Sequence, residues 1–117
     1  MAPQPAPALT QAAKDLADSR LAEPGLSAAM LARELNVSVR TLQRAFSSAG
    51  ESVTAYIRRR RLEEARLALS VPAGRVSVTE LAARWQFADS SHFTRAFKKR
   101  YGRTPTDYAR SSSSARS

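Results

Sequence analysis

Three side chains in the first half of the chain carry paired hydrogen-bonding groups at helical spacing. Arginine and glutamine each present two polar atoms in one plane, and this geometry matches the edge of a nucleic-acid base. Leu42 and Phe46 are four residues apart and share the core face of a predicted helix. The polar side chains among them are expected on the outer face, where they can contact bases. They are Arg40, Gln43 and Arg44.

A second set of outward polar side chains follows about fifty residues later. Phe93 and Phe97 share the core face of another predicted helix. Hydroxyl groups discriminate weakly between bases, so the first set is expected to carry more sequence information, with Arg95 the main contact of the second. For Arg44 and Arg95 the alternative is a solvated arginine or an ion pair with a neighbouring helix. The second set is Ser90, Ser91, Thr94 and Arg95.

The net charge separates into two basic blocks. The 117 residues hold 19 Lys and Arg against 10 Asp and Glu, a net of +9. Residues 1–39 carry −1, residues 40–66 carry +4, residues 67–83 are neutral and residues 84–103 carry +5. An amphipathic membrane helix would concentrate charge and apolar bulk in one segment. Two separated blocks favour two contacts with a polyanion and no membrane partner.

Several side chains near the two blocks are candidates for phosphate contact. The arginine run 58–61 is ambiguous, because Arg59 and Arg60 stand four residues before Glu63 and Glu64 and can form ion pairs along one helix. Arg58 falls on a stripe with Ala55, Leu62, Ala65 and Leu69 and is predicted to be partly structural. For Lys98 and Lys99, contact with phosphate is favoured over a role as solvated surface residues. The full set is Ser38, Arg59, Arg61, Lys98 and Lys99.

Apolar spacing predicts an all-α protein, since no stretch alternates as a strand does. Capping and stop signals predict seven helices: residues 10 to about 22, 27–35, 38–49, 52–69 (before Pro72 and Gly74), from 77, from 89 or 90 to 102, and from 105. The Pro/Ala-rich residues 1–8 and the serine-rich residues 111–117 are predicted to be disordered tails.

The chain contains an internal repeat. Residues 31–37 align with 81–87 at an offset of 50, residues 42–46 with 93–97 at 51, and Gly50 with Gly102 at 52. Each copy is typical of a helix-turn-helix, whose second helix enters the major groove. We expect subdomains at 9–51 and 71–110, joined by a linker helix at 52–70. Its 18 residues from Ser52 to Leu69 span about 27 Å, against about 34 Å between successive major grooves.

The region from about Leu9 to Arg110 resembles the DNA-binding domain of the AraC/XylS family of bacterial transcription regulators. The resemblance rests on Leu31-Ala32, Leu42-Gln43-Arg44-Ala45-Phe46, Tyr56-Ile57, Arg61-Leu62, Ala65, Leu69, Leu81-Ala82, Trp85-Gln86-Phe87, Ser91 to Lys99, Gly102 to Pro105 and Tyr108. It implies a sequence-specific regulator that binds double-stranded DNA, with recognition helices at about 38–49 and 90–101 in successive major grooves of an asymmetric site. The outward positions of the first helix match base-contacting positions of the family.

Three departures qualify this resemblance. The family usually carries glycine where Gln86 stands, so a left-handed residue with a side chain is expected there, at roughly 1 kcal/mol of strain. Asn36 fills the equivalent turn of the first copy and suits it better. The family's common amino-terminal effector domain is absent from these residues. MarA-type short activators are the nearer comparison, and a carboxy-terminal fragment of a longer regulator is the alternative.

Other functional classes lack the residues they need. The chain has no cysteine and one histidine, which argues against thiol catalysis and metal sites, and its four glycines are isolated. For His92, a role in packing or beside phosphate is favoured over a catalytic one. We therefore expect that the protein is not an enzyme and that it binds no cofactor and no metal. The expected protein is cytoplasmic, associated with the nucleoid and monomeric, with RNA polymerase as a further candidate partner. The alternative function is a basic helical module that binds RNA or protein.

Overall fold

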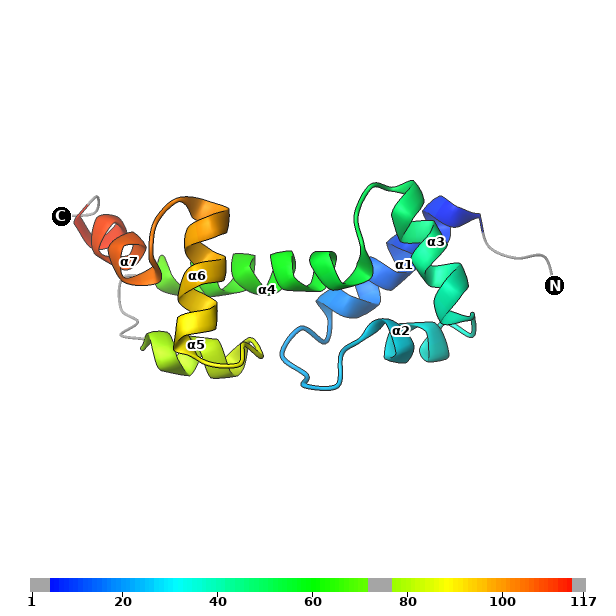
Figure 1. Ribbon diagram of the computed structural model, residues 1–117, viewed down its shortest axis with the longest axis horizontal. Helices are drawn as coiled ribbons and strands as arrows, with labels where there is room; N and C mark the ends of the chain where they lie inside the picture. Colours follow the sequence, from blue (N-terminus) through cyan, green and yellow to red (C-terminus); the bar gives the residue numbers. More distant parts are fainter. Residues whose placement is uncertain (1–4, 72–76, 115–117) are drawn as a thin grey trace. The chain divides into compact units, whose positions relative to one another are not determined.

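The computed structural model describes residues 5–71 and 77–114. Within these residues the chain forms seven α-helices and no strand (Figure 1), which confirms the all-α prediction. The helices are α1 (Ala6–Asp18), α2 (Ala28–Glu34), α3 (Val39–Ser48), α4 (Val53–Leu69), α5 (Val78–Arg84), α6 (Ser90–Tyr101) and α7 (Pro105–Ser114). The predicted stop signals Pro72 and Gly74, like residues 1–4 and 115–117 of the predicted tails, lie outside the described residues.

Side-chain caps begin most of these helices where the sequence predicts them. A cap oxygen accepts a backbone N–H that the first turn of a helix otherwise leaves unpaired. Asp89, rather than Ser90, caps α6 by accepting from the His92 amide at 2.7 Å. The other cap side chains are Ser27 on α2, Ser38 on α3, Ser52 on α4, Ser77 on α5 and Thr104 on α7.

The first helix differs from its prediction at both ends. It begins at Ala6, and Thr10 lies inside it with its hydroxyl donating to the Ala6 carbonyl at 2.9 Å. Pro7 fits here because the first turn does not use its missing N–H. The helix ends at Asp18 rather than near residue 22. Directly after Asp18, the Ser19 hydroxyl donates to the Leu16 carbonyl at 2.7 Å and competes with the backbone hydrogen bond that would continue the helix.

Both predicted tails are also shorter than expected. Helix α1 includes residues 6–8, and α7 continues through Ser114. Serine is only a moderate helix former, but the cost per residue is a few tenths of a kcal/mol and does not end a helix that is already nucleated. Composition alone therefore placed the ends of the ordered region too far inward.

The chain divides into two compact units, residues 1–60 and 61–117, and the division falls within α4. Unit one contains α1, α2, α3 and the first part of α4. Its core is mainly aliphatic and small: Leu9, Ala13, Ala17, Leu21, Leu26, Met30, Leu31, Ala32, Leu42, Ala45, Phe46, Val53, Tyr56 and Ile57. The finer partition into two subdomains and a linker stays a prediction.

Unit two contains the rest of α4 with α5, α6 and α7, and its core is aromatic. Phe93 and Phe97 are fully buried, with ring centroids 5.8 Å apart. The Tyr101 and Tyr108 rings lie 4.7 and 5.7 Å from the Phe97 ring. The predicted core positions of Phe93 and Phe97 are confirmed, and the half-buried Tyr101 and Tyr108 pack against them. The buried aliphatic members are Leu62, Ala65, Leu69, Leu81 and Ala82.

The turns of the two helix-turn-helix motifs have the same backbone structure. Asn36, after α2, has φ 61° and Gln86, after α5, has φ 65°, so both left-handed predictions are confirmed. The Val37 amide bonds the Ala32 carbonyl at 3.0 Å and the Asn36 amide bonds the Arg33 carbonyl at 3.2 Å. The same pair of bonds closes α5. This Schellman arrangement satisfies the last helical carbonyls and sends the chain into the second helix.

Candidate nucleic-acid interface

Helix α3 separates its core residues from its polar residues cleanly. Leu42, Ala45 and Phe46 are buried against the rest of unit one. The three candidate base contacts Arg40, Gln43 and Arg44 are all exposed. Their guanidinium and amide groups are therefore available on one surface of a helix whose other side is fixed by packing.

Helix α6 repeats this separation with different side chains. Phe93 and Phe97 are buried, while Ser91 and Arg95 are exposed. Ser90 and Thr94 are half-buried. The side chain of His92 is exposed, so the packing role considered from the sequence is wrong, while a place beside phosphate stays a prediction.

The phosphate candidates of α6 and α3 differ in how far their polar atoms are occupied. Lys98 and Lys99 are exposed in the last turn of α6, where positive charge also interacts favourably with the helix dipole. Ser38 is exposed, but its hydroxyl accepts from the Thr41 amide at 3.0 Å and donates to the Thr41 hydroxyl at 2.9 Å. The Ser38 hydroxyl therefore has a structural role as a cap, and only the hydrogen-bonding capacity that these two bonds leave is available to a ligand.

The arginines of α4 have partners outside their own helix. Arg59 donates to both carboxylate oxygens of Glu51, at 3.0 and 3.1 Å. Arg60 donates to Asp18 of α1 at 3.0 Å. Arg61 is half-buried, and burial lowers its pKa. The ion pairs of Arg59 with Glu63 and of Arg60 with Glu64 stay predictions. The contacts with Glu51 and Asp18 were not predicted, because spacing along a helix is visible in a sequence and a contact across a fold is not.

The predicted stripe on α4 fails at two positions. Arg58 is exposed and therefore does not belong to a structural stripe, and Ala55 is exposed as well. The residues that unit one buries from α4 are instead Val53, Tyr56 and Ile57. This spacing places a tyrosine at the centre of the packed face.

Tyr56 is the structural centre that sequence reasoning missed. Its hydroxyl donates to Asp18 at 2.8 Å, and its ring packs edge-on against Phe46 at 6.0 Å. Lys14 and Arg59 each lie 5.2 Å from the ring centroid. Burial and the bond to the Asp18 carboxylate raise the pKa of Tyr56 to about 12. The available signal was the repeat, which aligns Tyr56 with Tyr108.

Tyr108 occupies the equivalent place in unit two with other partners. Its hydroxyl lies 3.0 Å from the Ser70 hydroxyl, and Arg66 donates to it at 3.4 Å. The Arg66 guanidinium also lies 5.6 Å from the Tyr101 ring centroid. The hydrogen bond that Arg66 donates to the Tyr108 hydroxyl is the main cause that raises the pKa of Arg66. A tyrosine hydroxyl therefore links α4 to α1 in unit one, and α7 to the end of α4 in unit two.

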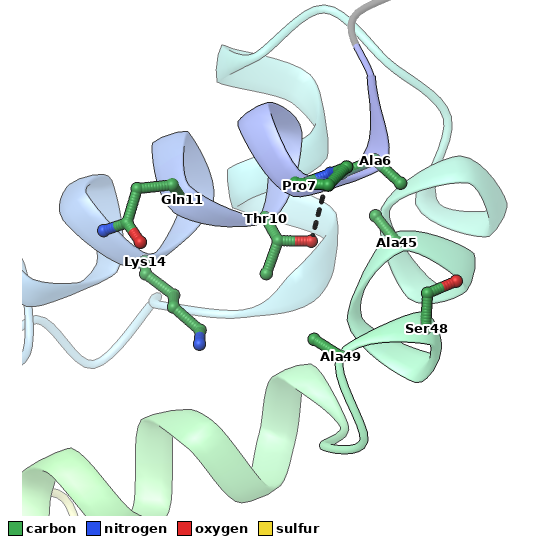
Figure 2. Close-up of a pocket in the computed structure, with 8 residues that line it drawn as sticks. All are labelled: Ala6, Pro7, Thr10, Gln11, Lys14, Ala45, Ser48 and Ala49. Carbon is green, nitrogen blue, oxygen red and sulfur yellow. Dashed lines mark hydrogen bonds between the residues drawn. The ribbon is translucent and has the colours of Figure 1, made fainter.

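A shallow groove lies between α1 and α3 beside the candidate base contacts (Figure 2). It has a volume of about 270 Å³, and Ala45, Ser48 and Ala49 form its α3 side. Its α1 side is formed by Ala6, Pro7, Thr10, Gln11 and Lys14. Most of these side chains are small, so they leave this space between the two helices unfilled.

Comparison with known proteins places this architecture in a family. A model of the helix-turn-helix domain matches residues 31–111, which include both motifs. The chain belongs to the AraC/XylS family. Its relatives include the transcriptional regulator Rob of Salmonella typhimurium, 42% identical over 72 residues, 61% of this chain and 24% of the relative. The transcriptional activator RhrA of Rhizobium meliloti is 30% identical over 98 residues, 84% of this chain and 31% of the relative.

Solved structures share the fold. The C-terminal domain of AraT, a response regulator of Geobacillus stearothermophilus, matches with a TM-score of 0.78 at 26% identity, over 88% of this chain and 84% of that one. CdpR of Pseudomonas aeruginosa, a transcriptional regulator, matches with 0.76 at 28%, over 87% of this chain and 31% of that one. The AraC-type chain thus spans 24% to 31% of the length of the two curated relatives described above.

No helix within residues 5–71 and 77–114 is long and apolar enough to cross a membrane. Across that same part of the chain, no group of three or more histidine, cysteine or acidic side chains is placed to hold a metal ion. On α3 and α6 the exposed candidate base contacts of this AraC/XylS member are Arg40, Gln43, Arg44, Ser91 and Arg95.

Proposed function

We propose that this chain binds double-stranded DNA in a sequence-specific manner and regulates transcription, with α3 and α6 as recognition helices. The observation that carries the proposal is the duplicated motif: in each unit the second helix buries its apolar face and exposes polar side chains on the other. A helix of this kind fits the major groove, where each base pair presents a distinct pattern of donors and acceptors. Membership of the AraC/XylS family supports the proposal.

The two recognition helices enter successive major grooves of one asymmetric site. The 17 residues of α4 span about 26 Å at 1.5 Å per residue, which is of the order of the roughly 34 Å groove repeat. The site is asymmetric because the outward side chains of α3 and α6 differ. Since one chain supplies both recognition helices, it binds as a monomer.

The proposed roles follow from side-chain chemistry and exposure. Arg40, Gln43 and Arg44 contact bases from α3, because Arg pairs with guanine and Gln with adenine through two hydrogen bonds each. Arg95 is the main base contact of α6, assisted by Ser90, Ser91 and Thr94. Lys98 and Lys99 bind phosphate, with a smaller contribution from Ser38 and Arg61. RNA polymerase is a second proposed partner, since a bound regulator acts on transcription through it.

The experiment that tests this function is selection of binding sites from random duplex DNA, followed by Arg44→Ala and Lys98→Ala on the selected site. Arg44→Ala should cost about 1–3 kcal/mol on that site and relax the preference at the base it contacts. Lys98→Ala should weaken all duplexes alike and reduce the slope of log affinity against log salt by about 0.9. Titrations at several salt concentrations measure both effects.

Two outcomes would contradict the proposal. Equal weakening of selected and random duplexes by Arg44→Ala would remove Arg44 from the base contacts. Selection that yields no preferred sequence, with structured RNA displacing duplex DNA equally well, would favour a basic module that binds RNA or protein.

A further inference from the structure

An ion pair between Glu51 and Arg59 attaches the end of α3, the proposed recognition helix, to α4. Glu51 follows Gly50, the left-handed residue that ends α3, and the Glu51 amide bonds the Phe46 carbonyl at 3.3 Å. The Glu51 carboxylate receives two hydrogen bonds from Arg59, at 3.0 and 3.1 Å. The backbone of Glu51 therefore closes α3, while its side chain holds a residue two turns along α4.

The surroundings of the pair favour a rigid attachment. The two side chains are only 31% and 26% exposed, and the Arg59 guanidinium lies over the Tyr56 ring. Tyr56 packs against Phe46 of α3, so the pair and the ring contact the same end of the recognition helix. A bidentate pair between planar groups fixes orientation as well as distance, which an exposed single-point ion pair does not.

From this geometry we infer that Glu51 and Arg59 are positioning residues for base contact by α3, and that Arg59 is not a phosphate ligand. The inference rests on the proposed function, because it requires α3 to contact bases. Gln43 and Arg44 must reach base edges with hydrogen-bond geometry, and such geometry depends on the orientation of the whole helix. The Glu51–Arg59 pair sets that orientation at the carboxyl end of α3.

The two roles of Arg59 predict opposite effects for the neutral variant of its partner. If Arg59 bound phosphate, Glu51→Gln would remove a competing carboxylate near the DNA and would strengthen binding to every duplex. If the pair positions α3, Glu51→Gln weakens the selected site and leaves random duplexes nearly unchanged. The sign of one measurement therefore separates positioning from phosphate contact.

The experiment measures affinity for the selected site and for a random duplex over a salt series, using the full chain. We expect Glu51→Gln and Arg59→Gln each to lose about tenfold on the selected site, which is within the worth of one bidentate base contact. The Glu51→Gln/Arg59→Gln variant should be no worse than either single variant, because both remove the same interaction. The preference should relax at the same base pairs as in Arg44→Ala, and the slope of log affinity against log salt should stay constant.

Matched variants control for charge and for folding. Arg58→Gln removes the same charge from an exposed position on the same helix, and Glu80→Gln removes an exposed carboxylate of unit two. Neither should change the base preference at the α3 positions. Arg59→Lys keeps the charge but not the fork, so it should behave as Arg59→Gln does. The exchange Glu51→Arg/Arg59→Glu should recover base preference, and circular dichroism of every variant verifies the helical content.

Three results would overturn the inference. These are stronger binding by Glu51→Gln, a salt slope reduced by about 0.9 in Arg59→Gln, or full function of Arg59→Lys. Failure of the proposed function gives a different result, since the unmodified chain would then select no sequence. In that case thermal unfolding of the same variants would still report whether the two residues are coupled, but base positioning would be rejected.

Discussion

The two units build one motif with different chemistry at equivalent places. The hydroxyl of Tyr56 links α4 to α1 in unit one, and the hydroxyl of Tyr108 links α7 to the end of α4 in unit two. In unit one the partner is the carboxylate of Asp18, with charged Arg59 and Lys14 against the ring. In unit two the partners are the neutral Ser70 hydroxyl and the charged Arg66 guanidinium, which donates to Tyr108. The repeat therefore fixes where the tyrosine lies, while the groups that bond its hydroxyl differ between the two units.

The two proposed recognition helices also differ. Helix α3 exposes Arg40, Gln43 and Arg44, whereas α6 combines hydroxyl side chains with Arg95. The cores differ as well, because α3 packs one phenylalanine among aliphatic residues and α6 packs two among other aromatic rings. Within the described residues, unit two therefore places more aromatic pairs in its core than unit one does.

The largest expected effect tests the difference between the cores. Phe46 and Phe97 are equivalent in the repeat, and Phe97 packs against three aromatic rings where Phe46 packs against Tyr56. Each Phe→Ala change should cost about 3–5 kcal/mol of unfolding free energy. Phe97→Ala should lie nearer the upper end, since each aromatic pair adds roughly 0.5–1.5 kcal/mol. Denaturant unfolding measures both, and an equal or larger loss for Phe46→Ala would refute the distinction.

A second prediction concerns alkaline pH. The pKa of Tyr56 is raised to about 12, whereas an unfolded tyrosine titrates near 10. Folded Tyr56 therefore keeps its proton to a higher pH than unfolded Tyr56, and this difference stabilises the folded state. The stabilisation is fully present below about pH 10 and falls by roughly 2 kcal/mol as the pH rises toward about 12. Tyr56→Phe should remove this part of the pH dependence. Urea unfolding across that pH range measures it, and an unchanged profile in Tyr56→Phe would contradict the assignment.

The smallest expected effect compares the two turns. Gln86→Gly should raise the unfolding free energy of unit two by up to about 1 kcal/mol, because glycine adopts a positive φ without the strain of a side chain. Asn36→Gly should gain less, since asparagine tolerates the left-handed conformation better than glutamine. Thermal or denaturant unfolding of the two variants decides the order. A larger gain at Asn36 would show that its turn, not that of Gln86, is the more strained.

The sequence was sufficient for features that depend on neighbours along the chain. Caps such as Asp89 and left-handed turns such as Gln86 involve residues within one or two turns, so their signals are local. The orientation of α3 and α6 followed from helical spacing of large apolar residues. The roles of the exposed polar residues stay predictions, because exposure alone does not establish a contact with DNA.

Contacts across the fold were beyond the sequence. Asp18 binds Tyr56 and Arg60, which are 38 and 42 residues away, and nothing in the spacing of a run of arginines identifies such a partner. The start of α1 was missed for another reason. Proline-rich composition suggested disorder, but Pro7 stands in the first turn, where it does not disturb the helical bonds.

The lone tryptophan and the buried tyrosine give each unit its own optical signal. Trp85 is the single tryptophan of the chain and packs against the aromatic core of unit two. Its fluorescence therefore follows unit two, whereas late ionisation of Tyr56, seen in ultraviolet absorbance, follows unit one. Loss of structure in either unit can be recorded in the unmodified chain, without an added dye.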